Sequence, residues 1–381
     1  MNIGFDAKRA YHNGTGLGNY SRTLVSDLSE LYPEHQYFLF NPKPSKRYTL
    51  QGHNIHEVLP QKKLYQIFNS IWRSHWIKKD IIKYNIDLFH GLSHELPLGL
   101  SNTGIKTIVT IHDLIFLRYP EQYNKIDVKI YIAKFKYACK KADHIIAISE
   151  QTKQDIIHYF GTDASKITVC HISCDRSYQT TVTDTEKLRV IKMLNLPEEY
   201  MLYVGSIIER KNLLGICKAI ALIKNEIRLP LVVIGRGKKY KEEVKAIAKE
   251  NGISDRLIFL SENENQSEEY ISGSCFPAIY QSAKLFIYPS VFEGFGIPVL
   301  EALFSKTPVI TSNVSSLPEV GGNAAYYVNP DNFIEIAEGI KKIINDKEFA
   351  EKMKADGLLQ ASKFTPEKCA SCVMDVYKKI V

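Results

Sequence analysis

The sequence predicts an α/β protein with two domains, each built on a mainly parallel β-sheet. A chain of 381 residues exceeds what one hydrophobic core usually serves. Short apolar runs alternate with longer helical patterns throughout, as in layered α/β folds. A polar, threonine-rich segment, Ser177–Glu186, interrupts this alternation and is the expected linker. We therefore expect domains over residues 1–178 and 187–364, followed by a C-terminal helix over 365–381.

Each half contains about six apolar runs of strand length, bounded by polar residues, glycine or proline. The expected strands of the first half are Asn2–Phe5, Tyr37–Phe40, Asp87–His90, Thr107–Ile111, His144–Ile148 and Ile167–Val169. Those of the second half are Met201–Val204, Leu231–Ile234, Leu257–Leu260, Leu285–Tyr288, Pro308–Thr311 and Ala325–Val328. This number of strands suits one Rossmann-like domain per half.

The composition is that of a globular protein, with 45% hydrophobic and 24% charged residues. No run of about 18 apolar residues occurs, which disfavours a membrane-spanning helix. The chain enters a strand pattern at Asn2 without a secretory leader, so we expect a cytoplasmic protein. The odd count of seven cysteines suits reduced thiols, and Cys369-x2-Cys372 has no second pair to complete a zinc site. The net charge of +7 favours acidic partners such as nucleotides or an anionic membrane surface, and no nucleic-acid-binding motif is present.

A glycine-rich segment, Asn13–Tyr20, follows the first expected strand. Its Gly-x-Gly-x-Gly spacing differs from the Gly-x-Gly-x-x-Gly of dinucleotide-binding folds, and no acidic residue ends the second strand. These two features disfavour a dehydrogenase. We expect a flexible loop.

Two basic, aromatic segments follow in the first half. Lys62–Ile82 gives a helical pattern with an apolar stripe that includes Trp72, with Trp76 at its margin and lysines around it. Lys125–Lys141 is similar in character. Two interpretations stay open: core-facing amphipathic helices with solvated lysines, or a peripheral patch that docks on anionic lipid.

Adjacent cations, Arg210 and Lys211, lie where a strand ending at Gly205 passes into a helix. Cations at such a turn can reach a diphosphate lying over the sheet edge. No Asp-x-Asp motif occurs in the chain, so no carboxylate pair of this kind is available to hold a divalent ion against the diphosphate. We therefore expect no metal and no cofactor, with protein cations in that role.

The segment Ser290–Ala302 carries two carboxylates, Glu293 and Glu301, eight positions apart. It follows the expected strand Leu285–Tyr288, and Pro298 suits a helix start. Both acids should project from the carboxyl edge of a parallel sheet, where α/β proteins bind ligands. The backbone N–H groups of three residues and the helix N-terminus form a site suited to hydroxyls and anions: Gly294, Phe295 and Gly296. The combination suggests a sugar-nucleotide site.

This Glu-x7-Glu segment resembles the motif of retaining glycosyltransferases of the GT4 family, as do Thr307–Asn313 and Ser315–Val320. The segments Val109–Glu121 and Ala142–Glu150 resemble a mannosyltransferase-rich branch of that family. The resemblance implies the GT-B architecture, in which two Rossmann-like domains face each other across a cleft and a C-terminal helix returns to the first domain. A polar segment, Glu262–Phe276, looks like an insertion relative to the family.

The resemblance also implies roles for the site residues. His112 would contact the donor sugar together with Glu293, Glu301 would hold the ribose, and Gly16 would approach the donor phosphate or the acceptor. The expected reaction moves mannose from GDP-mannose onto a sugar hydroxyl of a growing surface or lipid-linked glycan. The alternatives are UDP-glucose, UDP-N-acetylglucosamine or GDP-fucose as donor, and a noncatalytic sugar-nucleotide-binding subunit. Peripheral contact with the inner face of the cell membrane follows from the second interpretation of the basic segments.

Overall fold

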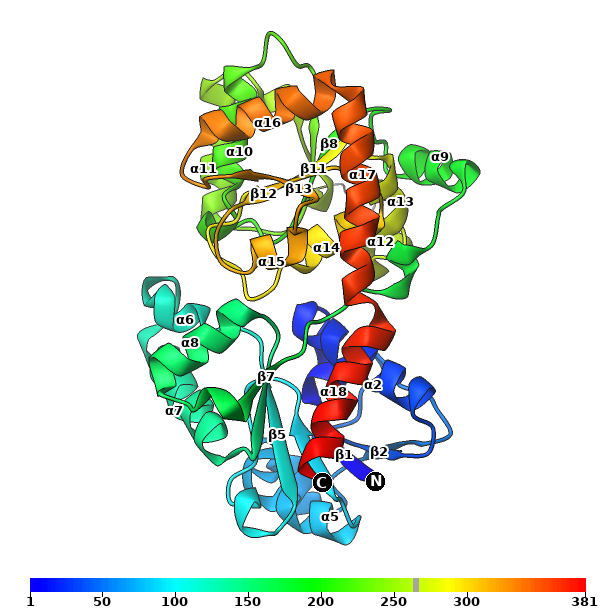
Figure 1. Ribbon diagram of the computed structural model, residues 1–381, viewed down its shortest axis with the longest axis vertical. Helices are drawn as coiled ribbons and strands as arrows, with labels where there is room; N and C mark the ends of the chain where they lie inside the picture. The colour runs from blue at the N-terminus through cyan, green and yellow to red at the C-terminus, as the bar shows by residue number, and fades with distance from the viewer. Residues whose placement is uncertain (263–266) are drawn as a thin grey trace. The chain divides into compact units, whose positions relative to one another are not determined.

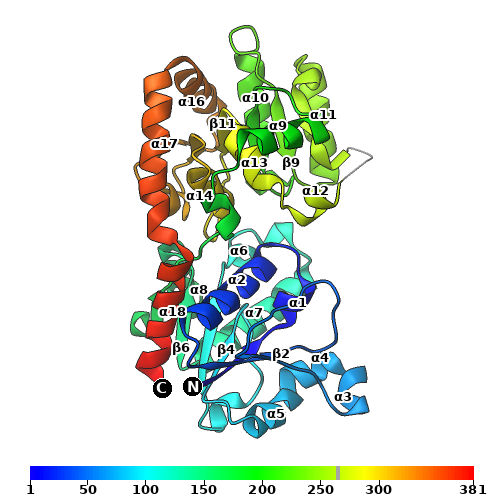
Figure 2. The same cartoon turned by 90° about the vertical axis from the view of Figure 1, so that its right-hand side faces the viewer.

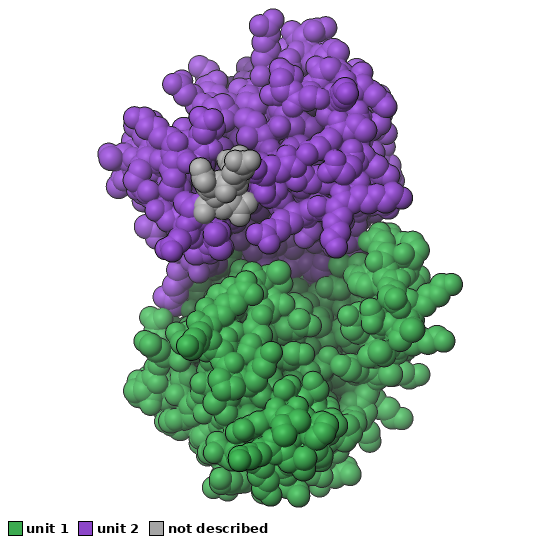
Figure 3. Space-filling view, turned by 180° about the vertical axis from the view of Figure 1, so that it is seen from behind, with its two compact units in different colours: residues 1–174, 364–381 green, residues 175–363 purple. Residues whose placement is uncertain are grey.

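The chain folds into two compact units, described here from a computed structural model of residues 1–262 and 267–381 (Figure 1). The first unit comprises Met1–Cys174 and Phe364–Val381, and the second comprises Asp175–Lys363. Figure 3 colours these units separately. Each unit contains one parallel sheet with helices packed on it, which confirms the predicted pair of Rossmann-like folds.

The first unit holds a seven-stranded sheet in the order β3-β2-β1-β4-β5-β6-β7. Its strands are β1 (Asn2–Asp6), β2 (Gln36–Phe40), β3 (Ile55–Val58), β4 (Leu88–Gly91), β5 (Lys106–Ile111), β6 (His144–Ala147) and β7 (Ile167–Val169). The central strands β4 and β6 are buried along their whole length, as expected for a parallel sheet covered on both faces. Edge strand β3 was not predicted, because Ile55–Val58 is short and carries His56 and Glu57 among its four residues.

The second unit holds a six-stranded sheet in the order β10-β9-β8-β11-β12-β13. Its strands are β8 (Met201–Val204), β9 (Leu231–Ile234), β10 (Leu257–Phe259), β11 (Leu285–Tyr288), β12 (Val309–Ser312) and β13 (Ala325–Val328). All six agree with the predicted runs to within one residue at each end. The predicted insertion, Glu262–Phe276, falls partly on residues 263–266, which lie outside the described residues.

Helices connect the strands of both sheets. In the first unit they are α1 (Lys8–His12), α2 (Gly16–Leu31), α3 (Lys63–Ile67), α4 (Asn69–Ile71), α5 (Ile77–Lys83), α6 (Ile115–Arg118), α7 (Lys125–Lys141), α8 (Glu150–Phe160) and α18 (Pro366–Ile380). In the second unit they are α9 (Asp184–Met193), α10 (Leu213–Leu222), α11 (Lys239–Glu250), α12 (Glu268–Ser272), α13 (Phe276–Ser282), α14 (Ile297–Phe304), α15 (Leu317–Gly321), α16 (Phe333–Asn345) and α17 (Lys347–Ala361). No helix of the described residues is both long and apolar enough to cross a membrane.

The C-terminal helix α18 packs against α2 of the first unit, as predicted (Figure 2). Its Tyr377 is fully buried, and the Tyr377 hydroxyl lies 2.6 Å from Nδ1 of His90 at the end of β4. Cys372 of the same helix places its sulfur 2.7 Å from that of Cys170, just after β7. Residues from the two ends of the chain therefore complete one core.

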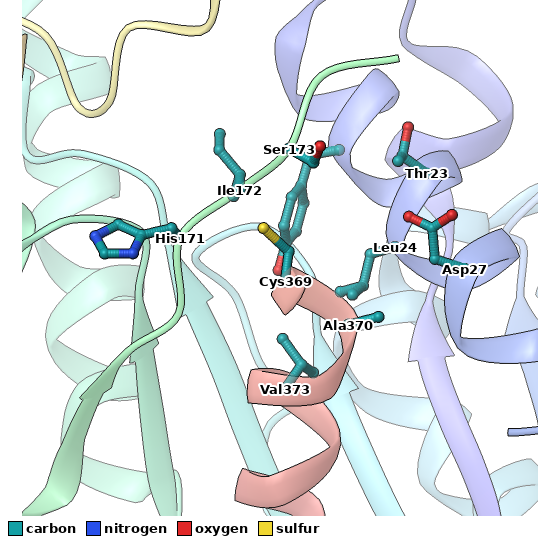
Figure 4. A pocket seen from close by; sticks show the side chains of 10 residues that line it. Thr23, Leu24, Asp27, His171, Ile172, Ser173, Cys369, Ala370 and Val373 are labelled. Carbon is teal, nitrogen blue, oxygen red and sulfur yellow. The ribbon is translucent and has the colours of Figure 1, made fainter. Parts of the chain in front are cut away.

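A small cavity lies between α2, residues 171–173 and the start of α18 (Figure 4). Asp27, His171 and Cys369 are among its lining residues. Its volume of about 20 Å³ is enough for roughly one water molecule, far below the size of a nucleotide sugar.

The predicted single helix over Lys62–Ile82 is interrupted. Helix α3 ends at Ile67, and the following residue, Phe68, leaves the helical region with φ of −98° and ψ of 47°. Trp72–Trp76 then forms a π-helical turn before α5. Trp72 is fully buried, and its indole N–H donates to Asp80 at 2.6 Å. Trp76 stacks on Tyr65 with ring centroids 4.9 Å apart. Trp72 therefore belongs to the core, and the half-buried Trp76 packs against it, which favours the core-facing of the two interpretations of this segment.

Candidate active site

Two sequence motifs meet where the strand order of the second sheet reverses, between β8 and β11. Neighbouring parallel strands end at the same sheet edge, so the loops after Val204 and Tyr288 lie side by side there. Open α/β sheets bind ligands at this kind of switch point. The contact from the backbone N–H of Val291 to the carbonyl of Arg210, at 2.8 Å, joins the two loops directly.

The first loop presents Arg210 and Lys211 from a short 3₁₀ turn, Glu209–Lys211. Asn212 follows in the left-handed conformation, with φ of 57°, and its side chain caps α10 by accepting from the N–H of Gly215 at 3.1 Å. The same amide donates to the carbonyl oxygens of Pro289 and Pro330 at 3.2 and 2.6 Å. Asn212 therefore fixes the turn that carries the cations to the second loop.

Glu293 on the second loop is paired with both cations. Its Oε1 lies 2.5 Å from Lys211 Nζ and 3.1 Å from Arg210 Nη1, and only 7% of the residue is exposed. Burial alone would raise the pKa of the Glu293 carboxyl, but Lys211 and Arg210 outweigh burial and hold this pKa below its ordinary value. Glu293 is therefore an ionised, largely desolvated carboxylate that is held by two positively charged side chains.

Three hydroxyl groups hold Glu293, two through its carboxylate and one through its backbone N–H. Ser290 Oγ donates to Glu293 Oε1 at 2.5 Å, and the Tyr288 hydroxyl donates to the same oxygen at 3.1 Å while accepting from Lys211. Ser315 Oγ accepts from the Glu293 N–H at 3.1 Å. The strand end and both loops thus position Glu293 together. Sequence analysis missed Tyr288, although its place as the last residue of β11 was a usable signal.

Gly296 shapes the start of α14. It adopts φ of 116°, and a Cβ added there would approach Leu317 Cδ2 to 2.8 Å, so only glycine suits the position. Ser316 Oγ donates to the carbonyl oxygens of Glu293 and Phe295 at 3.0 and 2.8 Å. Phe295 is 3% exposed and anchors the loop in the core, and Gly294 lies between it and Glu293. Gly205, which directly follows β8, lies against Tyr288, since a Cβ there would be 3.4 Å from the tyrosine ring.

Glu301 lies in the second turn of α14, because the helix begins at Ile297. The Tyr280 hydroxyl donates to Glu301 Oε2 at 2.8 Å. Burial raises the pKa of Glu301 to about 7, against the opposing effects of hydrogen bonds from Tyr280 and Tyr178. The two acids of the motif thus have different environments: Glu293 is charged, whereas Glu301 titrates near neutrality.

His112 and Gly16 belong to the first unit. His112 follows β5 and is 5% exposed, and its Nε2 lies 2.9 Å from the carbonyl oxygen of Leu92. Burial lowers the pKa of His112 to about 4, so its imidazole is neutral at pH 7. Gly16 is the first residue of α2, so the predicted flexible loop ends at Thr15. An added Cβ at Gly16 would meet nothing within 4 Å.

Among the residues that the structure describes, no group of three or more His, Cys, Asp or Glu side chains is arranged to hold a metal ion.

Two family matches together cover most of the chain. Residues 14–177 match the family described as Glycosyltransferase Family 4, and residues 184–359 match Glycosyl transferases group 1. These matches place the chain in a known class of enzymes. They agree with its two parallel Rossmann-like sheets and with the cation–carboxylate site at the switch point of the second sheet. The protein belongs to the GT4, group 1 glycosyltransferases and has the GT-B fold.

Curated relatives include O-antigen chain mannosyltransferase B of Escherichia coli, 28% identical over 99% of this chain and all of that protein. O-antigen chain mannosyltransferase RfbU of Salmonella typhimurium is 29% identical over 71% of this chain and 69% of its own. The serotype-specific mannosyltransferase WbdA of Escherichia coli is 30% identical over 80% of this chain, which spans only 37% of that longer protein.

Solved structures agree on the fold. The glycosyltransferase from Rickettsia africae aligns over 100% of this chain and 98% of its own, with a TM-score of 0.73 and 17% identity. WaaG, a glycosyltransferase involved in lipopolysaccharide biosynthesis, aligns over 99% of each chain, with a TM-score of 0.71 and 15% identity.

Proposed function

We propose that this enzyme transfers mannose from GDP-mannose, with retention of configuration, onto a sugar hydroxyl of a growing surface or lipid-linked glycan. The observation that carries the proposal is the ionised Glu293, held by Lys211 and Arg210 at the switch point of the second sheet. Membership in the GT4 family supplies the reaction class. The choice of mannose rests on the names of the O-antigen relatives.

In this proposal Arg210 and Lys211 bind the donor diphosphate. The leaving nucleoside diphosphate gains negative charge as the glycosidic bond breaks, and preformed cations stabilise that charge. Both side chains are largely buried, with 10% and 13% exposure, so they act in a poorly screened environment. No step of this scheme requires a metal ion.

Glu293 and His112 contact the transferred sugar. A carboxylate near the anomeric carbon stabilises the positive charge that develops there, and a neutral histidine can exchange hydrogen bonds with sugar hydroxyls. Glu301, when ionised, accepts hydrogen bonds from the ribose. Gly294, Phe295, Gly296 and Gly205 line the donor site, and Gly16 approaches the donor phosphate or the acceptor.

Retention without an assigned enzymatic nucleophile suggests substitution on one face of the sugar. The acceptor oxygen forms the new bond on the face from which the diphosphate leaves, and a phosphate oxygen takes the acceptor proton. We further propose that residues 1–178 form the acceptor side and 187–364 the nucleotide-sugar side, with 365–381 as a returning helix. The enzyme would work in the cytoplasm, at the inner face of the cell membrane.

A thermal-shift screen of nucleotides and nucleotide sugars tests the donor. Saturation at 100 times the dissociation constant stabilises the fold by about 2.7 kcal/mol. The expected result is stabilisation by GDP and GDP-mannose, and little by UDP, UDP-glucose or UDP-N-acetylglucosamine at equal concentration. Preferential stabilisation by a UDP-sugar would overturn the choice of donor.

Hydrolysis of GDP-mannose without an acceptor, measured with and without excess EDTA, tests catalysis. Slow, chelator-insensitive release of GDP is expected. Donor binding with no hydrolysis and no transfer to any glycan would instead favour a noncatalytic subunit. Loss of activity in EDTA, restored by magnesium or manganese, would show that a metal ion does the work assigned to Arg210 and Lys211.

A further inference from the structure

Two buried histidines of the first unit, His94 and His112, lie against each other where neighbouring strands end. His94 lies in the loop after β4, and His112 directly follows β5, the next strand of the sheet. Their ring centroids are 5.1 Å apart, with the ring planes at 71°. We call these two residues the histidine pair. His112 has a role in the proposed function, whereas His94 has none.

The fold fixes both the backbone and the ring of His94. Its φ of 65° lies in the left-handed region, which a residue with a Cβ adopts at a cost. Its backbone N–H donates to the carbonyl oxygen of Thr110 at 2.9 Å, and its ring stacks on Phe135 with centroids 4.4 Å apart and planes at 12°. The directions of the two ring nitrogens of His94 are therefore fixed as well.

Hydrogen bonds assign the role of one nitrogen in each ring. The backbone N–H of His112 donates to Nδ1 of His94 at 3.3 Å, so this Nδ1 is an acceptor and carries no hydrogen. Nε2 of His112 lies 2.9 Å from the carbonyl oxygen of Leu92. Because a carbonyl oxygen only accepts, Nε2 of His112 carries the hydrogen.

The other nitrogen of each ring takes the opposite role, because both rings are neutral. Burial lowers the pKa of His112 to about 4 and holds that of His94 well below its ordinary value, and the positive charge of Arg9 acts in the same direction on both. A neutral imidazole has one donor and one acceptor nitrogen. His94 therefore presents an Nε2–H donor, and His112 presents an Nδ1 acceptor.

These two remaining nitrogens have no hydrogen-bond partner in the described part of the chain. The ring contacts of His94 and His112 with described residues use Nδ1 of the first and Nε2 of the second. Neither of the other two nitrogens is among the fully buried side-chain atoms that lack a partner, so both reach solvent. The histidine pair thus offers one fixed donor and one fixed acceptor to a ligand, on residues that are only 9% and 5% exposed.

We propose that His94 is a further substrate-binding residue, and that the histidine pair binds one hydroxyl group of the transferred hexose. A hydroxyl group both accepts and donates a hydrogen bond, which matches Nε2–H of His94 and Nδ1 of His112. A carboxylate or a diphosphate oxygen only accepts, and would leave Nδ1 of His112 unmatched. The pair therefore selects an alcohol over an anion. The inference rests on the proposed function, which assigns His112 to the transferred sugar.

His94→Asn removes the donor alone. Asparagine tolerates the left-handed backbone conformation, and its Oδ1 can accept from the N–H of His112 in place of Nδ1, but its shorter side chain does not reach the position of Nε2. Hydrolysis of GDP-mannose without an acceptor should lose roughly ten- to a hundredfold in kcat/KM. Affinity for GDP should not change, because GDP carries no hexose.

Two further variants serve as controls. His144→Asn replaces a buried histidine of β6, whose Nε2 lies 2.8 Å from Thr168 Oγ1, and should leave kcat/KM unchanged. His94→Gln can place an amide N–H near the position of Nε2, so its loss should be smaller than that of His94→Asn. If His94→Asn melts below the assay temperature, His94→Gln replaces it in the comparison that follows.

Donor analogues separate sugar binding from a structural role. GDP-mannose and analogues that each lack one hexose hydroxyl are hydrolysed by the wild type and by His94→Asn. The loss caused by the substitution should disappear for one analogue, the one that lacks the hydroxyl bound by the histidine pair, and should persist for the others.

An equal loss with every analogue would assign His94 a structural role and overturn the proposal, as would an unchanged kcat/KM. If the wild type uses another nucleotide sugar, only the proposed choice of donor fails, and deoxy analogues of that sugar give the same comparison. A wild type that hydrolyses and transfers no nucleotide sugar would overturn both proposals.

Discussion

The ammonium nitrogen of Lys211 lies 2.5 Å from Oε1 of Glu293, across the gap between two loops that are 82 residues apart in the chain. Arg210 reaches the same oxygen at 3.1 Å. One carboxylate therefore holds two cations that we assign to the donor diphosphate. The diphosphate would bind to side chains that are already positioned, so little further ordering is needed.

Lys211→Ala should weaken GDP binding by roughly ten- to a hundredfold, since a hydrogen bond to a charged group contributes about 1.5–3 kcal/mol. It should also lower thermal stability, because it removes the nearer partner of a buried carboxylate. Calorimetric titration with GDP and a thermal melt measure the two effects. Arg210→Ala should show the same loss of affinity. Unchanged GDP affinity in both variants would contradict the diphosphate assignment.

Glu293→Gln should reduce turnover more than donor binding, because the charge of Glu293 matters most as the anomeric carbon becomes cationic. The substitution preserves shape and the acceptor oxygen, so the contacts of Ser290 and Tyr288 can persist. Steady-state kinetics should therefore show a lower kcat with a nearly unchanged KM. A raised KM with normal kcat would assign Glu293 to binding alone.

GDP affinity should depend on pH through Glu301, whose pKa is raised to about 7. The ribose hydroxyls donate to the ionised carboxylate, so affinity should fall toward tenfold per pH unit below pH 7 and level off above it. Glu301→Gln should remove this dependence. Tyr280→Phe removes a hydrogen bond that lowers the pKa, so the midpoint should move to higher pH. A flat profile in the wild type would contradict the ribose assignment.

Ionisation of Glu301 should lower the folding stability of the protein, although it raises the affinity for GDP. A carboxyl whose folded pKa is raised favours the protonated folded state. The stability that it contributes is complete below about pH 4.5 and is lost as pH rises through about 7. Glu301→Gln should therefore be more stable than wild type at pH 8 when no nucleotide is bound. Chemical denaturation at pH 6 and pH 8 provides the comparison.

Acid should destabilise the first unit through its buried histidines. Burial lowers the pKa of His90 to about 3 and that of His112 to about 4. The unfolded chain binds protons at these sites near pH 6.5, so stability falls as pH drops below that value. At pH 5 the loss is about 2 kcal/mol for each imidazole. Denaturation midpoints at pH 7 and pH 5 measure this loss of stability. His112→Gln should lose less stability between the two pH values than the wild type does. An equal loss would contradict the assignment of this effect to His112.

The fold was predictable because buried parallel strands are continuous apolar runs. Leu231–Ile234 and Leu285–Tyr288 are two such runs, and both form buried strands. Strand β3 was missed because an edge strand needs fewer apolar residues. The break at Phe68 was also missed: no glycine or proline marks it, and the burial of Trp72 against the sheet decides it. Local patterns do not report such tertiary preferences.

The site was predictable where chemistry follows a motif, as at Arg210, Lys211, Glu293 and Glu301. The hydrogen-bond partners of these residues were not, because Tyr288 and Tyr280 read as ordinary core aromatics until the fold places their hydroxyls beside a carboxylate. The titration of Glu301 near pH 7 likewise depends on burial, which the sequence does not specify.

The hydrogen bond between Tyr377 and His90 has a consequence for biosynthesis. A ribosome releases residues 1–174 long before residues 364–381, yet all of them share one core. The second unit is continuous in the chain and can finish folding as soon as it emerges from the ribosome. The first unit is synthesised earlier, but it cannot complete its core until α18 has been made. During translation the second unit thus completes its fold before the first unit does, although it is synthesised later. The apolar surface of the first unit that α18 later covers is the surface that a chaperone would shield.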